Sequence, residues 1–227
     1  MNKLTKTLCL TTALLTLSAA NSAVFADASD SIDVKIRAVG AFPISNKQTM
    51  SLAPVHAGKT ANKKLLNSGY GAEVSANYFV MNNLAIEGAI GIMHHKVKGL
   101  QSVSNAYMAN PHLNLKSHAT YVVPVKLTAQ YHILPENDSF SPYVGAGYHY
   151  AFTTSSPKGV KLSNGHGAVL QAGVDIVLSD NLGLNINVDQ YFRKMTAKYT
   201  TQVSDQALKG KYRMNPVAVG VGLALYF

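Results

Sequence analysis

The end of the chain, residues 217–227, alternates strictly between two kinds of side chain. Large aliphatic or aromatic residues occupy the odd positions, and Ala, Gly or Tyr occupy the even positions. A period of two predicts a strand whose two faces meet different environments. Small residues opposite large aliphatic ones favour a narrow closed barrel that is crowded inside and covered by lipid outside. The alternative is an ordinary strand of a soluble core, which usually carries polar residues on its second face.

The beginning of the chain has the pattern of a secretory signal. Lys3 and Lys6 precede an apolar run at 8–17, and small residues lead to Ala26. We therefore predict a signal peptide at 1–26 and a single barrel domain at 27–227. Cys9, the only cysteine, lies inside the signal, so the mature chain has no thiol or disulfide. An exported chain without a long apolar helical segment points to a β domain in the outer membrane of a Gram-negative bacterium.

Eight segments of the mature chain show the alternation. They are expected at about 31–44, 68–81, 84–97, 118–134, 140–154, 166–179, 182–203 and 212–227. Short turns are predicted at 82–83, 135–139 and 180–181, and longer loops at 45–67, 98–117, 155–165 and 204–210.

Long and short connections thus alternate along the chain, as they do in antiparallel barrels with short periplasmic turns and long outside loops. An open sheet edge in hydrocarbon would leave backbone N–H and C=O groups unpaired, so the last strand must close onto the first. We predict an all-β, eight-stranded, antiparallel transmembrane barrel of up-and-down topology, with both termini in the periplasm.

Four segments resemble the outer-membrane protein W (OmpW) family. They are PVKLTAQYHI (124–133), SPYVGAGYHYAF (141–152), QAGVDIVLSDNLGLNINV (171–188) and NPVAVGVGLALYF (215–227). A Trp common near the first strand of that family is missing, and the loop at 45–67 diverges. The resemblance implies an eight-stranded barrel that passes small hydrophobic molecules and releases them sideways through its wall.

Positive charge gathers in the predicted outside loops and the adjoining strand ends. These regions hold 14 of the 20 Lys and Arg residues, Lys63, Lys64, Lys209 and Lys211 among them, and one acid, Asp205. Such a basic rim favours phosphorylated lipopolysaccharide as a partner, and the alternative is a generic solvated surface. Export excludes nucleic acid as a partner. The last strand, ending at Phe227, is the expected contact with the barrel-assembly machinery.

The composition of the rim argues against an enzyme. Its histidines are His56, His94, His95, His112, His118 and His166, and almost no carboxylate accompanies them to orient a nucleophile or base. His94 and His95 are adjacent on a strand and so point to opposite faces, which prevents one metal from binding both. We predict no catalytic residues, no metal site and no cofactor.

The alternation along each strand predicts which side chains point inward, and these side chains fall into two zones along the barrel axis. The polar lumen floor is expected to contain Asp33, Lys35, Glu87, Lys126, Gln130, Asp175, Asn185, Asn187 and Asp189. The apolar upper lumen is expected to contain Val39, Ala41, Met93, Val122, Pro124, Val169, Tyr191, Met195 and Met214, with Glu73 and Arg193 as charged exceptions. Opposite charges on the floor should pair, because an isolated charge is costly in a narrow interior.

Three prolines lie in the upper halves of strands, namely Pro43, Pro124 and Pro216. Proline cannot donate to a ladder, so these residues either mark a lateral opening or end regular pairing above the hydrocarbon. Three functions stay open: a narrow channel for small hydrophobic molecules, which we favour; a structural or surface-interaction barrel acting as an envelope anchor, adhesin or receptor for phage or bacteriocin; and a general ion pore.

Overall fold

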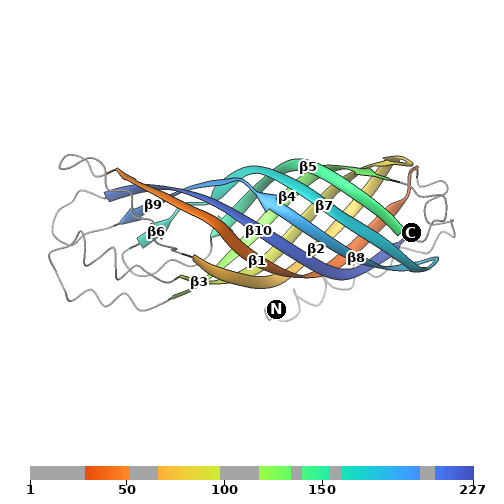
Figure 1. The fold of residues 1–227 in the computed structure, drawn as a ribbon, viewed down its shortest axis with the longest axis horizontal. Coiled ribbons are helices and arrows are strands. Elements are labelled where there is room, and N and C mark those ends of the chain that lie inside the picture. Colours follow the sequence, from red (N-terminus) through yellow and green to blue (C-terminus); the bar gives the residue numbers. More distant parts are fainter. Residues whose placement is uncertain (1–28, 52–65, 98–117, 134–139, 154–159, 200–207) are drawn as a thin grey trace, which may run out of the picture.

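The computed structural model describes residues 29–51, 66–97, 118–133, 140–153, 160–199 and 208–227. Nearly all of them lie in β-strands that tilt around one long axis (Figure 1). The strands are β1 (Ile32–Ser51), β2 (Leu66–Met81), β3 (Leu84–Val97), β4 (His118–His132), β5 (Phe140–Thr153), β6 (Val160–Leu162), β7 (Gly165–Ser179), β8 (Leu182–Tyr191), β9 (Arg193–Tyr199) and β10 (Leu208–Tyr226).

The ten segments form a closed, antiparallel, up-and-down barrel of eight strands, because two of the barrel strands consist of two segments each. β6 and β7 belong to one barrel strand, because β6 pairs with β9 as β7 pairs with β8. β8 and β9 likewise belong to one barrel strand, since both pair with β10. The barrel closes where β1 pairs with β10, from Asp33 opposite Tyr226 upward. The first and last strands of the described barrel are thus paired with each other, as predicted.

The two ends of the barrel differ in their connections. Two-residue turns at Asn82-Asn83 and Asp180-Asn181 join β2 to β3 and β7 to β8, as predicted. The first and last described residues lie at this same end, where Tyr226 N–H donates to Asn181 O at 3.1 Å. We call it the turn end, and the opposite end, to which β1 and β10 extend furthest, the loop end.

The barrel wall has apolar side chains outside and charged side chains inside, the reverse of a soluble protein. On β1, Ile36 is 52% exposed, whereas its neighbour Lys35 is completely buried. On β4, Leu127 is 61% exposed and Lys126 is 3% exposed. Aliphatic side chains therefore cover the outside, where lipid solvates them, and charged side chains fill the inside. Among the described residues, no helix has the length and apolarity needed to cross a bilayer.

Three predicted loops contain more strand than expected. β1 continues to Ser51, into the first part of the expected loop 45–67, and β10 begins at Leu208 inside the expected loop 204–210. The expected loop 155–165 contains β6. The predicted strand 182–203 is interrupted at Phe192, and its last residues, 200–203, lie outside the described part. Hydrophobic alternation misses the extra strand because residues 46–49 are polar or charged at consecutive positions, although backbone pairing with β10 continues there.

The close approach of β10 to β1 gives a test of the fold. A Cβ added to Gly222 would lie 1.9 Å from the carbonyl oxygen of Ile36, which is backbone and cannot turn away. Gly222→Ala should lower the free energy of unfolding by about 1–3 kcal/mol, as overpacking does. Gly88→Ala is the matched control, because nothing lies within 4 Å of the added atom. Equal urea midpoints of the two variants in lipid vesicles would contradict the β1–β10 register.

Candidate functional site

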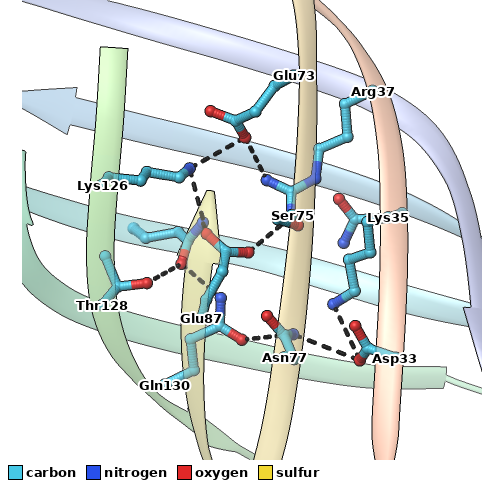
Figure 2. Close-up of polar contacts among 12 residues, drawn as sticks. Asp33, Lys35, Arg37, Glu73, Ser75, Asn77, Glu87, Lys126, Thr128 and Gln130 are labelled. Atoms are coloured by element: carbon cyan, nitrogen blue, oxygen red, sulfur yellow. Dashed lines mark hydrogen bonds and ion pairs between the residues drawn. The ribbon is translucent and has the colours of Figure 1, made fainter. Parts of the chain in front are cut away.

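A network of charged side chains fills the interior of the barrel. We call its members the ionic plug: Asp33, Lys35, Arg37, Glu73, Glu87, Lys126, Asp175 and Asp189. They come from β1, β2, β3, β4, β7 and β8, and Figure 2 shows those from β1 to β4 pointing toward one another. None is more than 5% exposed.

The upper part of the plug is built around two cations. Arg37 donates from Nη1 to Glu73 Oε1 at 2.7 Å and from Nη2 to Glu87 Oε2 at 2.6 Å. Its Nη2 also donates to Ser75 Oγ at 2.6 Å. Lys126 Nζ lies 2.6 Å from Asp189 Oδ2, 3.2 Å from Glu73 Oε1 and 3.3 Å from Glu87 Oε1. Glu73 and Glu87 are therefore each shared by the two cations, which come from β1 and β4.

The lower part of the plug is built around Lys35. Its Nζ lies 2.7 Å from Asp175 Oδ2 and 3.6 Å from Asp33 Oδ2, and it stands 5.0 Å from the centre of the Tyr143 ring. Asn185 Nδ2 donates to Asp175 Oδ1 at 2.8 Å and contacts the Tyr143 hydroxyl at 3.0 Å. The lysine is thus enclosed by acceptors and one aromatic face.

Amide side chains join the two parts. Gln130 Nε2 donates to Gln171 Oε1 at 2.7 Å, and Gln171 Nε2 donates to Glu87 Oε1 at 3.1 Å. Asn77 Nδ2 bonds Gln130 Oε1 at 3.0 Å and Asp33 Oδ2 at 3.3 Å (Figure 2). Because these side chains exclude water, the network fills the cross-section of a lumen that eight strands make narrow. At this level the side chains of the network leave almost no surface accessible to water.

Strand register explains how distant residues meet in the plug. Arg37 lies directly opposite Glu73 on β2, and Asp175 lies opposite Asn185 on β8. The buried ions are stable only as a set, because the free-energy cost of removing a charge from water is offset only by well-placed partners.

An apolar cluster lies above the plug toward the loop end. Its members are Val39, Ala41, Met93, Val169, Tyr191 and Ala218. Tyr191 joins the two layers, because its hydroxyl donates to Asp189 Oδ2 at 3.2 Å. Two further residues assigned to the upper lumen, Val122 and Pro124, are also buried. The side chains of Met195 and Met214 lie outside the described part.

The structure places the nine residues assigned to the polar floor in the buried interior, and it adds residues that sequence reasoning missed. Arg37, Gln171 and Tyr143 belong to the plug region, and each has the inward parity that could have identified it. Glu73 was assigned to the upper lumen, and this is wrong, because its carboxylate bonds Arg37 and Lys126. Residue count from a turn does not measure depth when strands tilt and their register is staggered.

The ladder between β3 and β4 is interrupted at one place. Ile90 pairs with Val125 and Met93 with Val122, but the two intervening in-register positions, Gly91–Ile92 and Val123–Pro124, are unpaired. The opposite edge of Pro124 remains paired with Ala151 of β5. Proline has no N–H to donate, which accounts for the loss on one side. We call this interruption the ladder gap.

The other two prolines face each other at the closing seam. Pro43 of β1 lies opposite Pro216 of β10, and the register shifts between Pro43 and Ser45. The pairing of β1 with β2 also ends just below, at Ala41 opposite Gly69. Regular pairing of β1 with both neighbours therefore changes at this height.

An apolar groove of about 660 Å³ lies on the outer wall over β1 to β5. Outward-facing side chains that line it are Val34, Val74, Ala76, Ile90, Val125, Leu127, Tyr148 and Tyr150. Gly88 leaves its centre open, since no atom lies within 4 Å of the position that a Cβ would take. Ile90 and Val125 form the last pair below the ladder gap, so the groove begins next to the gap.

The histidines do not converge on one site. His94 points outward between Tyr70 and Tyr121, with ring centroids 5.3 Å from each, whereas His95 is buried inside. His166 lies outside and its Nδ1 is 2.6 Å from the Tyr148 hydroxyl. Within the described ranges, no three His, Cys, Asp or Glu side chains are grouped to hold a metal ion. His56, His112, Lys63 and Lys64 lie outside the described part, as do the side chains of His118, Lys209 and Lys211.

Comparison with known proteins gives one consistent result. The model of the OmpW family matches residues 29–227. A putative outer membrane protein of Rickettsia typhi is 32% identical over 204 residues, covering 87% of this chain and 82% of the relative. A putative outer membrane protein of Rickettsia conorii is 33% identical over 177 residues, covering 77% and 70%.

Two solved structures share the fold. The crystal structure of the outer membrane protein OprG from Pseudomonas aeruginosa superposes with a TM-score of 0.67 at 17% identity, covering 88% of this chain and 96% of that one. The solid-state NMR structure of AlkL in DMPC lipid bilayers superposes with a TM-score of 0.62 at 16% identity, covering 92% and 93%.

The plug predicts an asymmetric mutational response. Arg37→Met leaves Glu73 and Glu87 without their guanidinium, so the free energy of unfolding should fall by about 3–5 kcal/mol. The triple variant Arg37→Met/Glu73→Gln/Glu87→Gln removes the cation together with both carboxylates and should recover part of that loss. Urea unfolding in lipid vesicles measures both. A triple variant less stable than the single variant would contradict the account of the plug as a mutually dependent set of charges.

Proposed function

The chain belongs to the OmpW family, and from this premise we propose that it takes small hydrophobic molecules in at the loop end and releases them sideways into the membrane. It is an outer-membrane β-barrel and not an enzyme. In the proposal, residues 1–26 are removed as the export signal, the loop end faces the outside, and the turn end faces the periplasm.

The observation that carries the proposal is the position of the ladder gap. Gly91 lies opposite Glu73, which belongs to the plug, and Met93, two residues further along β3, belongs to the apolar cluster. On β4, Pro124 lies two residues from Lys126 of the plug. The β3–β4 ladder is therefore interrupted at the boundary between the two layers. A solute stopped by the charged layer meets the unpaired stretch at that height.

The cost of opening the wall favours this place. In hydrocarbon, breaking a strand-to-strand hydrogen bond leaves two groups with no alternative partner. Where two residue pairs of the ladder are already unpaired, fewer hydrogen bonds are lost when the strands separate. An apolar solute loses nothing by passing from the cluster to lipid, whereas crossing the plug would require breaking buried ion pairs.

The outer groove supplies the next step of the route. It begins at the Ile90–Val125 pair and is lined almost entirely by apolar side chains. A solute that leaves through the gap would enter this groove before mixing with the surrounding lipid chains. The route thus stays apolar from the cluster to the membrane.

A reversible lock on the gap tests the proposal. Cysteines replacing Ile92 and Val123 would form a disulfide across the gap without changing Pro124, and the mature chain contributes no other thiol after removal of the predicted signal. We expect oxidation to abolish uptake of a hydrophobic fluorescent probe by cells that carry the variant in the outer membrane, and reduction to restore it.

The matched control for this lock is Ile86→Cys/Ala129→Cys, an in-register pair in the intact part of the same ladder. Its oxidation should leave uptake unchanged. Unchanged uptake after quantitative oxidation of the gap pair would remove lateral exit at β3–β4 from the mechanism. As a second arm, Met93→Trp or Val122→Trp should slow uptake by adding bulk at the apolar cluster while heat-modifiable migration shows a folded barrel.

The structural or surface-interaction reading remains the second candidate, and one observation favours it. The plug and the apolar cluster are closely packed, with Val169 and Asn185 completely buried, as expected of a barrel whose interior serves stability alone. Normal uptake in both Trp variants together with normal uptake in the locked gap variant would select this function over transport.

Lipopolysaccharide is the proposed partner of the basic rim. Neutralising Lys63, Lys64, Lys209 and Lys211 should weaken binding of the purified barrel to lipopolysaccharide, and added salt should weaken binding of the wild type, since exposed charges are screened. The readout is the binding isotherm at low and high salt. Binding that is indifferent to salt and to all four substitutions would show that the rim has a solubilising role only.

A further inference from the structure

Arg193 is a buried cation outside the ionic plug. It begins β9 and is 6% exposed, yet none of the carboxylates in the described ranges forms an ion pair with it. By contrast, Lys35, Arg37 and Lys126 each contact at least two carboxylates. A guanidinium removed from water is costly without an anionic partner, so Arg193 differs in kind from the plug cations.

The surroundings of Arg193 hold it in the lumen. A Cβ added to Gly165 would lie 2.6 Å from Arg193 Cδ, so the side chain lies directly across a position that has none. Its Nε donates to His149 Nε2 at 3.4 Å, and its guanidinium carbon is 5.9 Å from the centre of the Tyr191 ring. Tyr191 belongs to the apolar cluster, so the cation borders that cluster.

The ring of His149 lies next to Arg193 and carries a further N–H donor. A guanidinium can only donate, so His149 Nε2 accepts and the ring proton of the neutral imidazole lies on Nδ1. His149 is completely buried, and its Nδ1 makes no hydrogen bond of good geometry among the described residues, although the backbone of Gly167 and Ala168 lies beside the ring. The ring also packs edge-on against Tyr191, with centroids 4.8 Å apart. Donors from β5 and β9 therefore meet beside an apolar surface.

From this juxtaposition we propose that Arg193 and His149 bind the carboxylate of an amphipathic solute whose hydrocarbon chain packs against the apolar cluster. Arg presents paired N–H groups that match a carboxylate, and charge-assisted bonds of this kind are strong away from water. Ala41, Met93 and Val169 supply the adjoining apolar surface. The inference rests on the proposed function because it names a class of solute for the same chamber. The basic rim would draw such anions toward the loop end.

A binding experiment tests the site without requiring transport. The mature protein, carrying isotope-labelled histidine, is placed in nanodiscs and titrated with octanoate, and the His149 ring resonance is assigned with His149→Gln. Octanoate should shift that resonance saturably, and octanol and octylammonium should not. We expect the affinity for octanoate to fall at least about tenfold in Arg193→Met, equivalent to about 1.4 kcal/mol. Arg193→Lys should recover part of the affinity.

Three controls keep the outcomes distinct. Lys63→Met removes one positive charge from the rim and should leave the affinity within about twofold, since screened surface charges contribute little. Acetate should bind more weakly than octanoate, and equal binding would overturn the role of the apolar cluster. Equal shifts by octylammonium and octanoate in the wild type would overturn anion recognition, and this comparison needs no variant.

The chain's own acid is the remaining competitor. Asp205 is the acid that the sequence places near the loop end. If octanoate shifts His149 only in Asp205→Asn and not in the wild type, the site is filled by the protein itself and the proposal is wrong. Arg193-dependent binding of octanoate combined with unchanged uptake in the locked gap variant would uphold this site and reject the lateral route.

Discussion

The structure depends on the absence of hydrogen-bonding partners in hydrocarbon. Every backbone N–H and C=O at membrane depth needs a partner within the protein, so the strands must close on themselves. Pairing of β1 with β10 satisfies this requirement and brings both ends of the barrel domain to the turn end. The same requirement makes the ladder gap notable, because unpaired backbone groups in such a wall are costly.

The interior obeys a related constraint. Eight strands enclose a lumen that side chains fill, so charges placed there lose water and must find each other. The ionic plug meets this demand with carboxylates shared between cations, as Glu73 and Glu87 are shared by Arg37 and Lys126. The result is a layer that resists passage of water and ions. The apolar cluster, Arg193 and the ladder gap all acquire their proposed roles from lying above this closed layer.

Much of the fold could be predicted from hydrophobic alternation, because the inside and outside of the wall differ so sharply. Parity placed Lys35, Lys126 and Asp189 inside, and the turn residues at 82–83 and 180–181 located two hairpins. The register between strands could not be predicted from alternation along each strand, since register depends on how neighbouring strands pair. For that reason Glu73 was assigned to the wrong layer and the pairing of Arg37 was missed. Pro124 signalled weak pairing, but only the structure shows that the loss falls on the β3 side.

The central claim is that the ionic plug closes the lumen, and electrical recording in a planar lipid bilayer tests it most directly. The wild-type barrel, inserted at low density, should show no steady ohmic current, because every member of the plug is almost completely buried. A steady ohmic current that scales with salt concentration would show a water-filled pore through the plug. That result would contradict the closed layer on which the proposed lateral route depends.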